Sequence, residues 1–485
     1  MDDLPGLEPR AMWHSFLTLS AIPRRPGAEE AAANFVAEEG RVNGCTVERD
    51  AAGNVLLRQR ATPGQEDRPG LALQAHLDMV CEKDARSAHD FARDAIAVWR
   101  DGDDLRARGT SLGADNGIGV AAALAVLSER DLRHGPLEIL FTVDEERGLN
   151  GARAVSPGWL KAKKLVNLDS QAEGVLIVGC AGALDTVAVR EVSLELPPAG
   201  LAALRISVDG LAGGHSGIDI ARGRGNAIRI LSQVLLALGE DGPLRLASIE
   251  GGTKRNAIPR EATAVVCVDP ARAQRLREQV SRQEAAFREA LGTLEPALAL
   301  KVEEAAPVKV MAPAQAEAVL ALLLAAPHGV EEWSPTISGL VQTSTNLARV
   351  ETRPREVAVS FLTRSALDTS KAALSARIAS LGQFAGFEVS HGGAYPGWKP
   401  DPASRLARLV EEVYADLFEK RMTVAGVHAG LECSLLGHKH PGLEMVSFGP
   451  SMWDVHTPSE RASIASAARF YELLLAVVKR VARGD

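Results

Sequence analysis

Apolar runs of strand length alternate with helical patterns over the first 180 residues of the chain. Residues 116–130, "NGIGVAAALAVLSER", have the length and the Ala and Leu content of a buried helix, and residues 11–40 carry apolar positions at helical spacing. The strand-like runs are 54–59, 71–78, 137–146 and 164–170. Strands that alternate with helices are typical of an open α/β sheet, so this pattern predicts an α/β domain.

The pattern changes after about residue 183. Short stretches such as 262–269 and 355–366 alternate apolar and polar residues, as in a half-buried strand. Helical stretches separate them, at 226–238, 271–291, 313–325 and 368–382. These features predict an α+β unit with a mixed or antiparallel sheet. The two halves of this unit could represent a duplication, although the sequence indicates this only weakly.

A segment rich in Gly, Pro and Trp at 391–404 separates this α+β unit from the last part of the chain. Beyond it come a helix at 403–419, a strand at 443–450 and a final helix from about 459. A single core rarely exceeds roughly 250–300 residues, so a chain of 485 residues is expected to hold two domains. We interpret residues 1–183 and 396–485 as one α/β domain and residues 184–395 as a domain inserted into it.

The composition of the chain argues against some classes of binding partner. The net charge of −8 argues against general nucleic-acid binding, which needs a basic surface. No apolar run approaches the roughly 20 residues of a membrane span, and the N-terminal segment lacks the basic and apolar regions of a secretory signal. The five cysteines are scattered and form no CxxC pair. We therefore expect a cytoplasmic protein with no nucleic-acid or membrane partner and with reduced cysteines.

Acidic and imidazole side chains collect where the predicted strands end. They are His76 and Asp78, Glu145 and Glu146, Asp169, and His456, together with Asp115 in a Gly-rich loop before the buried helix. In open α/β sheets, ligands bind at the carboxyl ends of the strands, so we expect these side chains to form one site. Two imidazoles and several carboxylates suit zinc, manganese or cobalt. The carboxylates exceed the needs of one ion, which favours a hydrolytic site with two ions and a glutamate left as general base.

Each of these residues also has a purely structural interpretation. An Asp or Glu at a strand end is most often a turn or cap residue, and a single histidine is more often structural than a metal ligand. The joint placement of the set supports the metal site, and the sequence alone does not decide which glutamate is the base. The HExxH helix of many zinc proteases is absent.

Several segments resemble those of a known enzyme family. They are "AHLDMV", "GTSLGADNGIG", "FTVDEERGLNGA", "NLDS" and "SFGPSMWDVHTPSE", followed by "GGHSGIDI", "TKRNAIPREA", "YPGWKPDPAS" and "HAGLECSLL". Their combination resembles the di-zinc metallopeptidase family of aminoacylases, carnosinases and bacterial dipeptidases. Within that family the chain is most similar to the aminoacyl-histidine dipeptidase (cytosolic non-specific dipeptidase) group. The resemblance extends over essentially the whole chain.

The resemblance implies a role for each matching residue. One ion would be held by His76, Asp115 and Asp169, and the other by Asp115, Glu146 and His456, with Asp115 as the bridge. Glu145 would be the general base, and Asp78 would orient His76. In the inserted domain, His215 would stabilise the oxyanion, although a turn residue is the simpler interpretation of a histidine in that Gly-rich loop. Asn256, Arg364 and Gly430 would contact the substrate.

The resemblance also implies a particular fold and a particular reaction. They are a zinc-peptidase-like α/β catalytic domain with a mixed sheet flanked by helices, and an inserted α+β lid domain that forms a homodimer. The enzyme would hydrolyse dipeptides, either Xaa-His or a broad range, with two divalent ions. Zinc is the expected metal, and manganese or cobalt fits the same ligands. The family also implies a cis peptide bond between Asp115 and Asn116.

Three alternatives stay open at this point. The same metal core would serve an N-acyl amino acid deacylase or a tripeptidase. A serine hydrolase using Ser111 or Ser216 is a second possibility, although no GxSxG segment is present. A protein that retains the fold without catalysis is the third.

Overall fold

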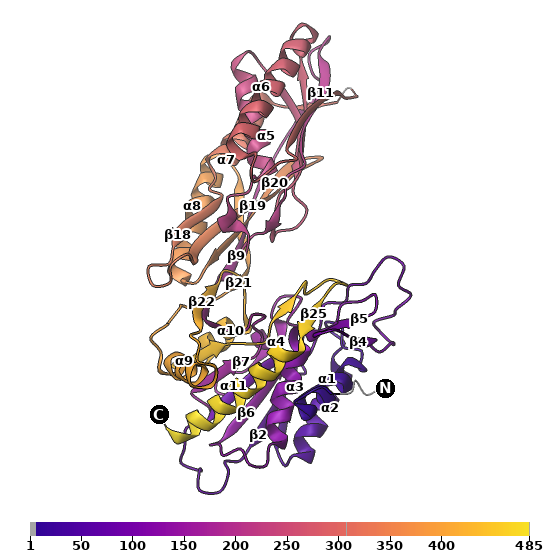
Figure 1. The fold of residues 1–485 in the computed structure, drawn as a ribbon. Coiled ribbons are helices and arrows are strands. Elements are labelled where there is room, and N and C mark those ends of the chain that lie inside the picture. Colours follow the sequence, from indigo (N-terminus) through magenta and orange to yellow (C-terminus); the bar gives the residue numbers. More distant parts are fainter. Residues whose placement is uncertain (1–5, 307, 485) are drawn as a thin grey trace. The chain divides into compact units, whose positions relative to one another are not determined.

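The computed structural model describes residues 6–306 and 308–484, which form two compact units (Figure 1). The first unit comprises Met1–Cys180, Trp398–Gly426 and Leu431–Asp485, and the second comprises Ala181–Gly397 and Val427–Gly430. These boundaries lie within three residues of the predicted ones, except that 427–430 belongs to the second unit. The first five residues, part of the segment examined for a secretory signal, lie outside the described residues.

An eight-stranded mixed sheet forms the centre of the first unit. Its order is β1 (Thr46–Arg49), β2 (Val55–Gln59), β6 (Leu137–Thr142), β3 (Leu71–His76), β7 (Lys164–Asn167), β23 (Glu444–Ser447), β8 (Val175–Cys180) and β22 (Thr423–Val427). A small sheet of β24 (Met452–Trp453), β25 (Arg461–Ser463), β5 (Asp104–Ala107) and β4 (Val98–Asp101) accompanies it. The predicted class, a mixed sheet flanked by helices, is confirmed.

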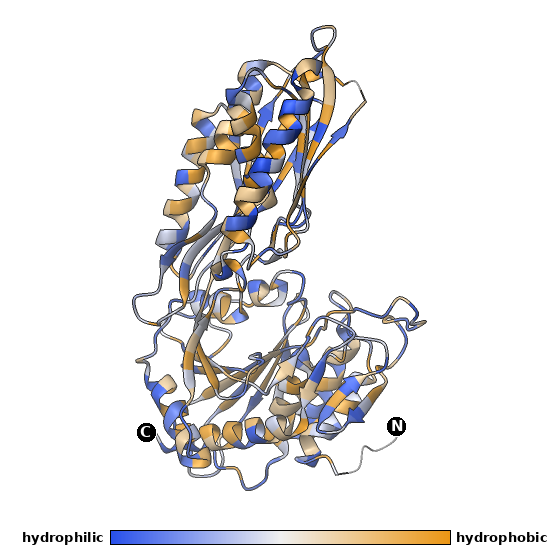
Figure 2. Cartoon of the chain, turned by 45° about the horizontal axis from the view of Figure 1, so that its top comes forward, coloured by the Kyte–Doolittle hydropathy of each residue, from blue (hydrophilic) through white to orange (hydrophobic). Residues whose placement is uncertain are grey.

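Seven helices of the described residues belong to this unit. They are α1 (Arg10–Ser20), α2 (Glu30–Val42), α3 (Ala114–Ser128), α4 (Asn150–Ala154), α9 (Arg405–Phe418), α10 (Glu432–Lys439) and α11 (Ile464–Arg483). The apolar positions of α11, among them Phe470, Leu474 and Val478, are buried and recur at helical spacing. Figure 2 shows this helix with both colours, whereas the central strands are mostly hydrophobic. None of the described helices is long and apolar enough to cross a bilayer.

The parallel strands fix where the polar residues lie. Strand β3 pairs in parallel with β6 and β7, and β7 pairs in parallel with β23, so the four carboxyl ends share one edge of the sheet. All six residues of β3 and of β6 are buried, as expected for parallel strands covered on both faces. Both strands are shorter than predicted. They end at His76 and Thr142, so Asp78, Glu145 and Glu146 lie in the loops that follow.

Helix α3 packs against β3 and carries Asp115 in its first turn. Every residue from Ala114 to Leu127 is buried, which explains why the helix beyond Asn116 is apolar on all sides. Gly113 precedes it with φ of 69°, and a side chain there would collide with Arg24 and Met79. The Gly-rich segment therefore lets the chain turn tightly into the helix.

The second unit is built on an antiparallel sheet. Its order is β16 (Ala299–Glu304), β11 (Ala202–Asp209), β15 (Ala262–Val268), β13 (Arg245–Gly251), β19 (Val341–Arg353), β20 (Glu356–Ser365), β9 (Gly182–Glu191) and β21 (Glu388–Tyr395), with β18 (Gly329–Trp333) also paired to β19. Two short pairs are β10 (Leu194–Glu195) with β17 (Val310–Met311), and β12 (Gly214–His215) with β14 (Ala257–Ile258). This is the α+β architecture predicted for the inserted domain.

Four helices lie along one face of this sheet (Figure 1). They are α5 (Ala227–Glu240), α6 (Ala273–Leu291), α7 (Pro313–Ala325) and α8 (Asp368–Phe384), and two short 3-10 turns occur at Ile220–Arg222 and Pro270–Arg272. The core between helices and sheet includes Ile228, Leu231, Val266, Leu347 and Phe361.

A polar contact fixes the start of α5 against β19. The Asn226 side chain accepts hydrogen bonds from the backbone N–H groups of Ile228 and Arg229 and donates to the Leu347 carbonyl at 2.8 Å. The Leu347 N–H donates to His328 Nδ1 at 3.3 Å. An N–H that points at Nδ1 requires this nitrogen to be unprotonated. Burial, with a smaller effect of Arg229, lowers the pKa of His328 to about 3.

This contact predicts that acid destabilises the second unit. The unfolded His328 takes up a proton below about pH 6.5, whereas the folded ring stays neutral until about pH 3, so falling pH between these values favours unfolding. Hydrogen exchange of peptides from α5 and β19 should therefore accelerate as pH falls through this window, after correction for intrinsic rates. His328→Asn should flatten that dependence, and His391→Asn, at an exposed position of the same unit, should not. Equal pH dependence in all three proteins would contradict the assignment.

Candidate metal-binding active site

The carboxyl edge of the parallel strands gathers the predicted ligands into one cluster. Three of the four sets of described residues with ligand atoms within 4.8 Å of one another belong to this cluster: His76 with Asp115 and Asp169, Asp115 with Glu146 and His456, and His76 with Glu145 and Glu146; the fourth is Glu29 with Asp78 and Asp144. Asp115 is common to the first two sets, which are the two candidate ligand sets that the family resemblance implied.

Asp115 lies between the two histidines. Its Oδ1 is 3.1 Å from His76 Nε2, and its Oδ2 is 3.2 Å from His456 Nε2. Asn116 Nδ2 donates to Asp169 Oδ1 at 2.7 Å and so positions the third carboxylate. The peptide bond between Asp115 and Asn116 is cis, as predicted from the family resemblance.

Asp78 contacts both the histidine and the glutamates. Its Oδ1 lies 3.4 Å from His76 Nδ1, the ring nitrogen that faces away from Asp115. The same carboxylate accepts the backbone N–H of Glu145 at 3.1 Å and that of Glu146 at 3.0 Å. Asp78 is fully buried. The backbone carbonyl oxygen of Asp78 also lies 3.2 Å from His76 Nδ1, so Asp78 contacts the ring through two oxygens and holds the loop that carries both glutamates.

Two buried residues outside the predicted set hold the loop before α3. The Glu460 carboxylate accepts the backbone N–H groups of residues 112–115, at 2.7, 3.0, 2.9 and 3.3 Å. The Arg24 guanidinium donates to the carbonyls of Leu77, Asp78 and Gly113. Together they connect the end of β3 with the start of the helix that carries Asp115.

A row of buried polar side chains crosses the parallel strands one layer below the ligands. Gln74 on β3 donates to Glu432 Oε2 at 2.5 Å and accepts from Asn167 on β7 at 2.6 Å. Thr142 on β6 donates to Glu432 Oε2 at 2.6 Å, and Ser447 on β23 donates to Asn167 Oδ1 at 2.5 Å. Gln74 and Asn167 each precede a predicted ligand by two residues. The row therefore ties four strand ends to one another and to α10.

The four residues predicted to contact substrate lie together in the second unit. Arg364 is buried and donates to Ser216 Oγ at 3.3 Å and to Tyr395 Oη at 3.2 Å, and its Nη2 is 3.5 Å from His215 Nε2. A side chain at Gly430 would collide with the Tyr395 ring. The Asn256 carbonyl accepts the Ser216 N–H at 2.8 Å, while the residue itself is exposed.

The chain is similar to a known peptidase family and to a bacterial dipeptidase. The model of peptidase family M20/M25/M40 matches residues 72–480. The chain is 40% identical over 482 residues to the cytosol non-specific dipeptidase of Escherichia coli strain K12, and the match covers 99% of each protein. The chain belongs to peptidase family M20/M25/M40. It is therefore a metallopeptidase, and the family predicted from the sequence is confirmed.

Solved structures agree with this M20 assignment. The aminoacylhistidine dipeptidase of Vibrio alginolyticus matches with a TM-score of 0.89 and 37% identity, covering 98% of this chain and 97% of that one. A tripeptidase of Staphylococcus aureus matches with a TM-score of 0.58 and 18% identity, covering 98% and 99%. The second likeness concerns the fold alone.

The electrostatics of this M20 site favour cations. Burial alone would lower the pKa of His76, but Asp169, Asp115 and Asp78 outweigh it and raise that pKa well above its ordinary value. Burial opposes protonation of His456 as well, yet its hydrogen bonds to Asp115 and Glu146 raise its pKa to about 11. The carboxylates thus favour any positive charge placed among them.

Sequence reasoning missed the residues that support the cluster from a distance. Glu460 ends the quoted segment "SMWDVHTPSE", yet nothing in the segment indicates that it binds a loop 345 positions away. Arg24 lies in an unremarkable "PRRPG" segment. The row of buried polar side chains did have a signal in the sequence, since Gln74 and Asn167 lie within strands that are otherwise apolar. Such amides are buried only when they have hydrogen-bond partners.

Glu460→Ala should loosen the loop that carries Asp115. The variant leaves four buried N–H groups without their acceptor, so we expect a loss of about 3 kcal/mol in the free energy of unfolding and weaker metal binding. Urea unfolding and competition with a chromophoric chelator measure the two effects. Glu460→Gln should lose less stability and less metal affinity, since it keeps one acceptor oxygen. Glu472→Ala, on the exposed face of α11, should change neither property. If Glu460→Ala unfolds in urea and binds metal as the wild type does, Glu460 does not hold the loop that carries Asp115.

Asp78→Ala should weaken metal binding by about 10- to 100-fold without unfolding the core, because partners of metal-bound histidines have effects of this size. Zinc titration against a chelator gives the affinity, and far-UV circular dichroism monitors the fold. Asp78→Asn keeps an acceptor oxygen, so its zinc affinity should lie between those of the wild type and Asp78→Ala. Unchanged affinity in Asp78→Ala would show that His76 is oriented by other contacts.

Proposed function

We propose that this M20 metallopeptidase is a dipeptidase that hydrolyses the peptide bond of dipeptides with two divalent ions. The observation that carries the proposal is the ligand cluster at the sheet edge, in a chain that matches the Escherichia coli non-specific dipeptidase over 99% of both lengths. The likeness to the Vibrio alginolyticus aminoacylhistidine dipeptidase supports the same substrate class, with either Xaa-His or a broad range of dipeptides as substrate.

The donor set fits two ions. His76, Asp115 and Asp169 would hold one, and Asp115, Glu146 and His456 would hold the other. Glu146 Oε1 is buried and lies 3.1 Å from His456 Nε2, so these two proposed ligand atoms face each other. When bound, the ions supply Lewis-acid activation of water and of the scissile carbonyl. Zinc is the expected metal, with manganese and cobalt compatible with the same donors.

Glu145 is the proposed general base. Burial raises the pKa of Glu145 well above its ordinary value, and Glu146, Asp169 and Glu432 add to this effect although His76 opposes it. Its carboxylate therefore has a high affinity for a proton. This suits a group that takes a proton from the attacking water and then transfers it to the leaving amine.

His215 has the tautomer that oxyanion stabilisation needs. The backbone N–H groups of Gly217 and Ile218 donate to its Nδ1 at 3.2 and 3.1 Å, so the proton of the neutral ring is on Nε2. Burial and the neighbouring Arg364 lower the pKa of His215 to about 4, which keeps the ring neutral at physiological pH. The Nε2–H group is thus available to stabilise a developing oxyanion.

Arg364 is the proposed partner of the substrate's terminal carboxylate. The described residues provide no carboxylate within ion-pair distance of its guanidinium, although it is buried in the second unit. A buried guanidinium is well suited to binding a carboxylate through two parallel hydrogen bonds. We assign Asn256 and Gly430 to the same substrate-binding surface and the second unit to the role of lid and homodimer interface. The relative's cytosolic name supports a cytoplasmic location.

The alternative functions have less support. A tripeptidase or N-acyl amino acid deacylase would use the same metal core, but the near full-length relative is a dipeptidase. A serine hydrolase needs a histidine hydrogen-bonded to its nucleophile. Ser111 Oγ instead donates to the Val80 carbonyl, and Ser216 Oγ accepts from Arg364.

Glu145→Ala should abolish dipeptide hydrolysis while the protein retains close to two ions per chain. The variant removes the proton acceptor but neither predicted ligand set. Metal content by plasma mass spectrometry and turnover of a dipeptide measure the two properties. The matched variant Glu146→Ala should lose metal as well as activity. Loss of metal from Glu145→Ala would show that this residue is a ligand rather than the base.

Removal and replacement of the metal test the substrate class. Chelator-stripped protein should be inactive and should melt at a lower temperature, because ions that bind only the folded state stabilise it. Reloading with zinc, manganese or cobalt should restore hydrolysis of dipeptides in preference to tripeptides and N-acetyl amino acids. Preference for tripeptides or acyl amino acids would reject the dipeptidase assignment, and activity that resists full metal removal would reject the metal mechanism.

A further inference from the structure

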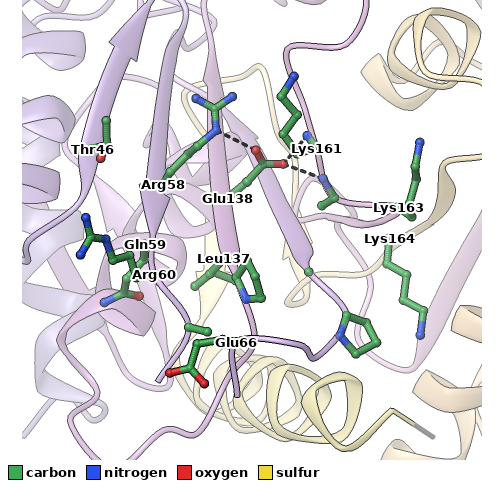
Figure 3. A pocket seen from close by; sticks show the side chains of 15 residues that line it. Thr46, Arg58, Gln59, Arg60, Glu66, Leu137, Glu138, Lys161, Lys163 and Lys164 are labelled. Atoms are coloured by element: carbon green, nitrogen blue, oxygen red, sulfur yellow. Dashed lines mark hydrogen bonds and ion pairs between the residues drawn. The ribbon is translucent and has the colours of Figure 1, made fainter. Parts of the chain in front are cut away.

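A cavity of about 890 Å³ lies in the first unit, at the sheet edge opposite the metal ligands (Figure 3). Its wall includes Gly70, which immediately precedes β3, and Leu137 and Lys164, the first residues of β6 and β7. The other ends of these strands lead to His76, Glu145 and Asp169. The cavity is therefore separate from the proposed active site, and its size is within the range of about 300–1,000 Å³ typical of small-molecule sites.

The lining carries a local excess of positive charge. It contains five basic side chains, Arg58, Arg60, Lys161, Lys163 and Lys164, and two carboxylates, Glu66 and Glu138. This composition is unusual in a chain whose net charge is −8. The excess of basic over acidic side chains therefore creates an electrostatic potential that attracts anions to this cavity.

Glu138 offsets the charge of Arg58 and leaves the other four cations without an acidic partner among the described residues, because its oxygens are already used. Arg58 also forms an ion pair with Glu48, outside the lining. Its Oε1 accepts from Arg58 Nε at 2.9 Å, and its Oε2 accepts the backbone N–H groups of Lys161 and Ala162 at 2.8 and 2.9 Å. Arg58 Nη2 also donates to the Trp159 carbonyl at 2.6 Å. Glu138 is buried, so these contacts hold one wall of the cavity in place before any ligand binds.

The remaining cations have no acidic partner. Among the described residues, no carboxylate forms an ion pair with Arg60, Lys163 or Lys164, and Lys161 Nζ donates only to the Gly158 carbonyl. Figure 3 shows Arg60 on one side of Leu137 and the lysines on the other. Leu137 is buried, and Pro69 and Pro136 also line the cavity, so an apolar floor lies between charged sides.

We propose that this cavity binds a small organic dianion with an apolar or aromatic body. The free ammonium groups and Arg60 would neutralise the negative charges, and the apolar floor would cover the body. Either a phosphate monoester or a dicarboxylate has this chemistry. An inorganic anion would lack the contact with the floor, and a neutral molecule would leave the cations without a partner.

Isothermal titration of the metal-loaded protein tests the proposal. The probes are AMP as a phosphate monoester, naphthalene-2,6-dicarboxylate as a dicarboxylate, inorganic phosphate without a body, and adenosine without a charge. At least one organic dianion should bind about tenfold more tightly than both phosphate and adenosine, and its affinity should fall as salt increases. The dianion that binds identifies the charged group that the cavity prefers.

The double variant Lys163→Glu/Lys164→Glu should weaken that binding at least about tenfold while leaving dipeptide hydrolysis unchanged. The charge-matched control Lys420→Glu/Arg421→Glu changes two exposed cations elsewhere in the unit and should leave binding intact. The proposal is overturned if neither dianion binds saturably, if phosphate or adenosine binds as tightly, or if the Lys163/Lys164 variant binds like wild type. None of these outcomes depends on the dipeptidase assignment, which activity measures separately.

Discussion

The first unit is organised around the cost of burying carboxylates next to one another. Asp78, Asp115, Glu145, Glu146 and Asp169 meet at one edge of the sheet, and His76 and His456 are the titratable cations in direct contact with them. Such a cluster is costly unless positive charge enters it and every remaining oxygen has a donor. Divalent ions would satisfy the first requirement, and hydrogen bonds from Asn116 to Asp169 and from the Glu145 and Glu146 backbone to Asp78 meet part of the second.

The supporting residues follow from this requirement. Asp78 binds the backbone of Glu145 and Glu146, and Glu460 binds the backbone leading to Asp115, so the loops are fixed although their side chains repel one another. The row from Thr142 to Ser447 sets the strand ends beneath them. The candidate ligands are therefore positioned by buried contacts of the protein itself, as a precise metal site requires.

Much of this arrangement is local in sequence and was therefore predictable. Strand length, alternation with helices and polar residues at strand ends predicted the fold class and a pool of candidate site residues that includes His76, Asp115 and Asp169, whereas the roles within that pool came from the family resemblance. The remainder depends on contacts between distant positions. Glu460 and Arg24 act on loops far away in the chain, and the true ends of β3 and β6 are set by sheet pairing rather than by composition. Neither periodicity nor spacing records such contacts, and only the family resemblance separated the role of Glu145 from that of Glu146.

The central claim is that this cluster holds two ions that share Asp115. Anomalous diffraction at the zinc edge, from crystals of zinc-loaded protein, tests it most directly. Two peaks per chain are expected, one among His76, Asp115 and Asp169 and the other among Asp115, Glu146 and His456, with Glu145 outside both coordination spheres. A single peak, or direct coordination by Glu145, would contradict it.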